Sequence, residues 1–83
     1  MPYIEKIFRE SARKTPIGAG ELDYNITMTI LEYLQNEGWN FSNMNLIVGV
    51  LENVKDEFQR RVMYPHEDKK CQLNGDVYPE FPR

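Results

Sequence analysis

Basic and aromatic side chains gather near the end of the longest predicted helix, and they are the best candidates for binding chemistry. Guanidinium and ammonium groups bind phosphates, and flat rings stack on bases. This mixture suits a nucleotide or a short single strand. The candidate ligand-binding residues, called the basic–aromatic cluster below, are Arg60, Arg61, Tyr64, His66, Lys69, Lys70 and Tyr78.

The same residues have a second interpretation, which is a solvated and neutralised helix surface. Asp56 precedes Arg60 by four positions, and Glu57 precedes Arg61 by four. Both spacings allow ion pairs along one helix. The two lysines likewise follow directly after two acidic residues. Binding site and neutralised surface are therefore both open interpretations of this cluster.

Catalytic groups are sparse. His66 is the one histidine, and the carboxylates of Glu67 and Asp68 follow it. A histidine with a carboxylate can act as a general base, but these three residues lack a metal-ligand spacing. Cys71 lies five positions from His66, off the i+4 spacing that would bring a base to its thiol. We expect no catalytic residue, no metal and no cofactor, and hence a protein that is not an enzyme.

Composition sets further bounds. The chain has 83 residues, with 10 Lys and Arg against 13 Asp and Glu, for a formal charge of −3. This balance argues against a strongly basic nucleic-acid module, and the single cysteine excludes an internal disulfide. We find no apolar run that could span a membrane and no signal-peptide pattern. We expect one helical domain over residues 1–78 and a flexible tail over residues 79–83.

Two helices are predicted in the first half of the chain, because apolar residues recur there every three or four positions. The first covers residues 2–13, where Pro2 suits the opening turn. Residues 15–20 contain one proline and two glycines and are predicted to be a loop. The second helix runs over about residues 21–37, and Gly38 is typical of a helix end.

The third predicted helix begins near Ser42, with Ser42 or Asn43 as its N-cap. Its apolar residues keep helical spacing as far as Val62. Pro65 then removes a backbone donor and clashes with the preceding turn. The helix either ends there or kinks and continues as a shorter helix that stops at Asn74-Gly75.

These elements predict an all-α fold, with a short N-terminal helix followed by an antiparallel helical hairpin. So small a hairpin leaves apolar stripes uncovered, and Trp39 and Phe41 add to them. A three-helix monomer is one solution. We favour a homo-oligomer in which a second copy completes a four-helix bundle.

Three stretches of the chain resemble a family of small bacteriophage and prophage proteins. Residues 20–26 are close to the pattern G-x-L-N-Y-x-I, and residues 45–52 form the second stretch. The third contains Pro65, Glu-Asp-Lys-Lys at residues 67–70 and Asn-Gly-Asp-Val-Tyr at residues 74–78. The chain departs from the family at four positions, where Asp23, Tyr64, His66 and Cys71 stand in place of Asn, Ala, Tyr and Ile.

The family that the chain resembles has no established activity. The resemblance therefore implies a biological context, which is phage infection, and not a mechanism. Small phage proteins without catalytic groups often act by binding. Some block a host defence protein, and others form oligomers that sequester nucleotide signals. We expect a non-enzymatic protein of the host cytoplasm that sequesters a nucleotide-type defence signal in an oligomeric pocket. The alternative is an inhibitor or adaptor that binds a host defence protein directly. Neither a membrane nor a nucleic acid is expected as a partner.

Overall fold

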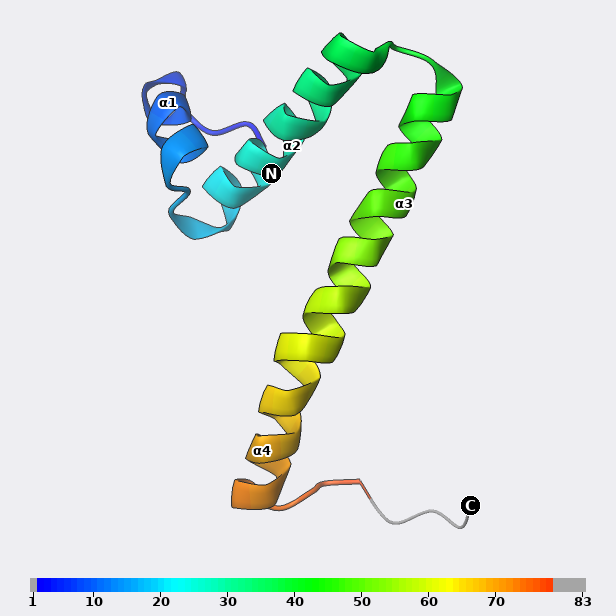
Figure 1. The fold of residues 1–83 in the computed structure, drawn as a ribbon. Helices are drawn as coiled ribbons and strands as arrows, with labels where there is room; N and C mark the ends of the chain where they lie inside the picture. Colours follow the sequence, from blue (N-terminus) through cyan, green and yellow to red (C-terminus); the bar gives the residue numbers. More distant parts are fainter. Residues whose placement is uncertain (1, 79–83) are drawn as a thin grey trace. The chain divides into compact units, whose positions relative to one another are not determined.

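Every regular element in the described part of the chain, residues 2–78, is helical in the computed structural model (Figure 1). This confirms the all-α prediction. The elements are α1 (Lys6–Lys14), α2 (Gly18–Glu37), α3 (Phe41–Phe58), the π-helical segment η1 (Gln59–Met63) and α4 (Tyr64–Asn74).

Contacts divide the chain into two compact units, one ending at Ile47 and the other beginning at Val48. The single domain over residues 1–78 and the antiparallel packing of the hairpin stay predictions. The predicted flexible tail, residues 79–83, lies outside the described residues.

Helix α1 begins at Lys6, so the prediction of a helix from Pro2 was wrong. In a helix that began at Pro2, the Phe8 N–H would donate to the carbonyl of Ile4. It donates instead to the carbonyl of Glu5 at 3.0 Å. The Ile4 carbonyl accepts from the Nε of Arg9 at 3.1 Å. A side-chain donor thus replaces the helical one, and the segment before Lys6 stays outside the helix.

Helix α2 begins at Gly18, and the predicted loop over residues 15–20 is correspondingly shorter. Gly18 has a φ of 75°, which glycine adopts without steric cost. The Ile17 N–H is satisfied by Oε1 of Glu21 at 3.2 Å. A carboxylate in the first turn also suits the helix dipole. The glycines that indicated a loop therefore lie inside the first turn of α2.

The α2–α3 connection is tied by two asparagines. Gly38 ends α2 as predicted, with a φ of 117°. Helix α3 begins at Phe41, so its N-cap is Asn40 and not Ser42 or Asn43. The Asn40 Oδ1 accepts from the Asn43 N–H at 2.9 Å. The Asn43 side chain donates back to the Gly38 carbonyl at 3.0 Å. Each asparagine thus satisfies backbone groups that a helix end leaves unpaired.

The first unit is held by packing of α1 on α2. Ala12 of α1 and Leu34 of α2 are the buried apolar residues among residues 2–78. The Arg13 side chain forms a polar clamp between the two helices, called the Arg13 clamp below. Its Nη1 donates to the carbonyl of Asn25 at 2.9 Å and to its Oδ1 at 3.0 Å. Its Nη2 forms an ion pair with Oε1 of Glu32 at 2.6 Å. One guanidinium therefore fixes α1 against more than a turn of α2.

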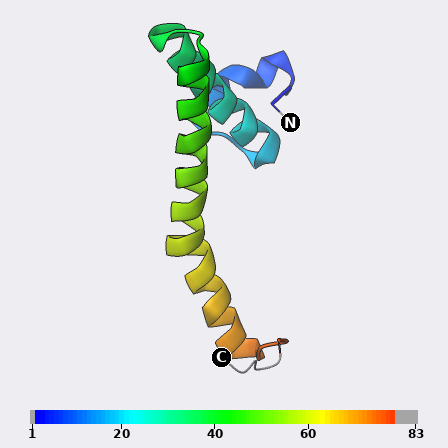
Figure 2. The same ribbon diagram turned by 90° about the vertical axis from the view of Figure 1, so that its right-hand side faces the viewer.

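In the second unit, the helix neither stops nor breaks at Pro65. The Tyr64 N–H donates to the carbonyl of Gln59, five residues back, which closes a π-type turn. Pro65 then occupies the opening turn of α4, where its missing N–H is tolerated. The widened turn accommodates the proline ring. Figure 2 shows the ribbon changing direction across η1, so the kinked alternative is the observed one.

Candidate functional site

The basic–aromatic cluster lies entirely in the second unit, and all of its side chains are exposed. Arg60 and Arg61 come from η1, four members come from α4, and Tyr78 follows the turn after α4. A single continuous helical stretch therefore positions most of the cluster. Whether it binds a ligand stays a prediction.

The two arginines share one carboxylate. Glu57 accepts from Arg60 Nη2 at 2.7 Å through Oε2 and from Arg61 Nε at 2.8 Å through Oε1. The predicted ion pair of Arg61 with Glu57 is thus found. Arg60 also pairs with Glu57, three positions before it, and not with Asp56 as predicted. The Arg60 and Arg61 side chains are 71% and 73% exposed. Exposed pairs contribute about 0–1 kcal/mol, so Glu57 orients these arginines without binding them tightly.

One surface hollow, of about 510 Å³, lies at the end of α4. Gly75, with a φ of 85°, redirects the chain after the helix, and residues 76–78 line the hollow together with the last turns of α4. The hollow contains Lys70 and Tyr78 of the basic–aromatic cluster, together with the carboxylates of Glu67 and Asp76. The Tyr78 N–H donates to Oδ1 of Asp76 at 2.9 Å, which holds the turn. A cation and an aromatic ring thus share one concave surface.

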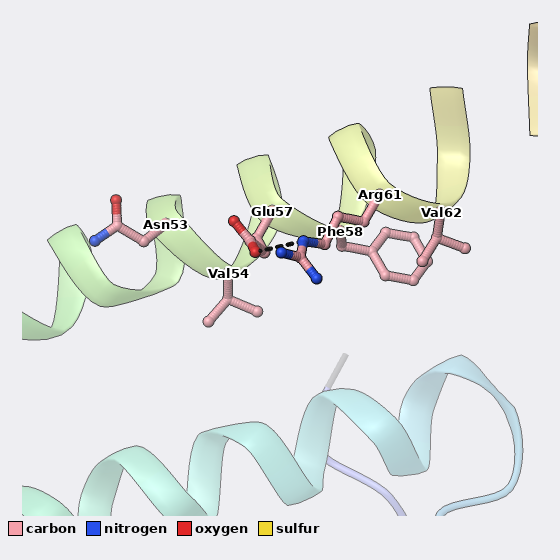
Figure 3. A pocket seen from close by; sticks show the side chains of 6 residues that line it. All are labelled: Asn53, Val54, Glu57, Phe58, Arg61 and Val62. Carbon is pink, nitrogen blue, oxygen red and sulfur yellow. Dashed lines mark ion pairs between the residues drawn. The ribbon is translucent and has the colours of Figure 1, made fainter. Parts of the chain in front are cut away.

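A second hollow, of about 480 Å³, follows the end of α3 (Figure 3). Figure 3 shows Val54, Phe58 and Val62 leaving the helix on one side, with the Glu57–Arg61 ion pair beside them. The periodicity predicted these residues as one apolar face of a helix and did not indicate a binding site there. Its signal was the recurrence of large apolar residues at intervals of four.

The two hollows divide the predicted site. Lys70 and Tyr78 lie in the first, and Arg61 lies in the second. The other four members of the cluster line neither hollow. The carboxylates in both hollows also keep the neutralised-surface interpretation open.

Among residues 2–78, no group of three or more His, Cys, Asp or Glu side chains could hold a metal ion. Within the same residues, no helix combines the length and apolarity needed to cross a membrane.

Comparison with known proteins gives a family. The sequence profile of DUF6899, a domain of unknown function, matches residues 1–77. The chain belongs to the DUF6899 family. No curated protein and no solved structure gives a significant match. The DUF6899 match spans both units and every member of the basic–aromatic cluster except Tyr78, which follows directly. The family description names no activity.

Proposed function

We propose that this DUF6899 protein is a non-enzymatic phage protein that counters host immunity. It acts in the host cytoplasm by sequestering a nucleotide-type defence signal. The observation that carries the proposal is the hollow at the end of α4, in which Lys70 and Tyr78 lie together. Its volume of about 510 Å³ falls in the usual range of small-molecule sites. The ammonium group would contact a phosphate, and the ring would stack on a base.

The hollow as one chain forms it is incomplete for this task. Glu67 and Asp76 also line it and oppose a phosphate electrostatically. Further cations are needed to offset them, and a ligand must be enclosed on more sides than one helix and a turn provide. Further subunits of a closed oligomer would supply both. The proposed pocket is therefore oligomeric, and the protein acts as a sponge with binding sites in simple ratio to its subunits.

Native mass spectrometry of the purified chain tests this function. Spectra are recorded alone and with a pool of cyclic nucleotides and ADP-ribose-type molecules. The proposal expects a closed oligomer that gains ligand mass in simple ratio to its subunits. A protein that takes up no molecule from this pool contradicts it.

Two variants sharpen the result. Lys70→Gln removes the cation of the hollow, and we expect ligand retention to fall about tenfold or more, since charge-assisted hydrogen bonds contribute about 1.5–3 kcal/mol. Lys14→Gln is the matched control, because Lys14 is exposed and lies in α1, outside both hollows. Equal retention by the two variants would count against the α4 hollow as the site.

The apolar hollow beside α3 favours a second candidate function. In this alternative, the protein is an inhibitor or adaptor that binds a host defence protein directly. Phe58 is 57% exposed at the centre of this hollow, and large exposed apolar side chains are typical of interaction surfaces. In this case, the purified chain binds none of the nucleotides, and Lys70→Gln has no effect on its anti-defence activity.

A further inference from the structure

The apolar stripe of the second unit is symmetric about one residue. Val54 and Val62 lie four positions before and after Phe58, and all three line the same hollow. Their exposed fractions are 61%, 57% and 54% in chain order. None of residues 48–78 is buried, so nothing within this unit covers the stripe. An exposed stripe with such symmetry is suited to contact with itself.

The charges beside the stripe change sign at the same residue. We call residues 52–57 the acidic arm and residues 59–64 the basic arm. The acidic arm has three carboxylates against one lysine, and the basic arm has two arginines and no acid. Glu57 and Arg61 both lie at the hollow, next to the apolar side chains. The surface therefore has an apolar centre with opposite charge on its two arms.

We propose that a second copy of this chain packs antiparallel along the stripe, with the two-fold axis at Phe58. Each Phe58 then meets its own counterpart, and Val54 meets Val62 of the partner subunit. The contact is isologous, so every pair occurs twice. The inference deepens the proposed function, on whose oligomer it rests, by naming the surface that joins two copies.

Charge complementarity selects the antiparallel direction. In an antiparallel pair, one edge of the stripe faces the same edge of the other copy, which runs in the opposite direction. Glu57 therefore comes beside Arg61 of the partner subunit. A parallel pair would place acidic arm beside acidic arm and basic arm beside basic arm, which is unfavourable. The existing pairs of Glu57 with Arg60 and Arg61 are exposed and contribute little, so their rearrangement costs little.

The size of the contact sets its expected strength. An overlap symmetric about Phe58 and starting at Val48 covers residues 48–68, or about 30 Å of helix. One helix pair of this length lies at the small end of stable interfaces, which bury about 800 Å² per partner. Assembly should therefore respond strongly to a single change at the centre. In Phe58→Asp, two carboxylates would meet at the axis in place of two rings.

Disulfide trapping tests the pairing and its direction. In a Cys71→Ser background, Val54→Cys and Val62→Cys chains of different mass are mixed and oxidised with copper–phenanthroline, without nucleotide. The proposal expects the mixed Val54–Val62 disulfide as the main dimer, together with little dimer in either chain alone. Main formation of the two self-disulfides would overturn it in favour of parallel packing, and absence of any cross-link would overturn the interface.

Sedimentation velocity separates this inference from the proposed function. The unmodified chain should be an oligomer without nucleotide, and Phe58→Asp should shift it to the monomer mass. The control is Leu73→Asp, which changes an exposed apolar residue of α4 outside both hollows. This variant should keep the oligomer mass. Circular dichroism of each variant checks that its helices are retained. A monomeric unmodified chain overturns the inference, whereas an oligomer that binds no nucleotide leaves it standing and refutes only the sponge.

Discussion

The two units of this DUF6899 chain keep their helices in place in different ways. In the first unit, α1 and α2 are joined by side chains of their own, through buried Ala12 and the Arg13 clamp. In the second, one helical stretch from Val48 to Asn74 has no buried residue. Internal contacts therefore specify the first unit, whereas we infer that association with a second copy specifies the second.

The largest expected loss of stability follows from a change in the core of the first unit. Ala12 is fully buried, so Ala12→Asp places a carboxylate where water is excluded. We expect a loss of about 3 kcal/mol or more in unfolding free energy, measured by urea denaturation followed by circular dichroism. The control is Ser11→Asp, at an exposed neighbouring position. Equal effects of the two variants would mean that α1 does not depend on burial at Ala12.

Removal of the clamp should have the next largest effect. Arg13→Ala leaves the Asn25 carbonyl and the Glu32 carboxylate without their guanidinium. We expect a loss of about 2 kcal/mol in the same assay, because charge-assisted hydrogen bonds exceed neutral ones. Lys14→Ala, at an exposed position on the same helix, should change stability by less than about 0.5 kcal/mol. A silent Arg13→Ala would refute the clamp as the element that joins α1 to α2.

The cap of α3 should have a smaller effect. Asn40→Ala removes the acceptor of the Asn43 N–H, and we expect a loss of about 1 kcal/mol. Ser42→Ala should be near neutral, because Asn40 and not Ser42 caps the helix. If Ser42→Ala proved the more harmful of the two, the helix would begin later than Phe41.

The smallest expected effect is a gain in the stability of α3. A methyl group added at Gly49 meets no atom within 4 Å beyond its chain neighbours and the backbone of its own helix. We expect Gly49→Ala to stabilise α3 by up to about 1 kcal/mol, because alanine has the higher helix propensity. The sedimentation coefficient of the oligomer should not change. A loss of assembly would instead indicate that another chain approaches closely at Gly49.

Local signals predicted much of the fold. The apolar periodicity predicted the helices, Gly38 marked the end of α2, and Pro65 indicated a kink as one of two alternatives. Helix starts were less predictable. The shift of α1 depends on the Arg9 side chain, and the start of α2 depends on Glu21 reaching back to Ile17. Such side-chain contacts leave no periodic pattern in the sequence.

The candidate site was predictable by residue type but not by grouping. Charge and ring chemistry selected Lys70 and Tyr78, yet only the turn at Gly75 brings them into one hollow. The Arg13 clamp joins residues 12 to 19 positions apart, so it depends on how α1 meets α2. The apolar periodicity predicted the Val54–Phe58–Val62 stripe, and the small size of the chain predicted uncovered apolar surface, but neither predicted which stripe stays exposed.

Hydrogen–deuterium exchange of the full chain at several protein concentrations tests the contrast between the units most directly. We predict that amides of α2 keep the same protection at every concentration, because α1 and α2 pack on each other. Protection of residues 48–74 should rise with concentration in the unmodified chain and stay low in Phe58→Asp. Protection of residues 48–74 that is independent of concentration would contradict the inference that a second copy completes this unit.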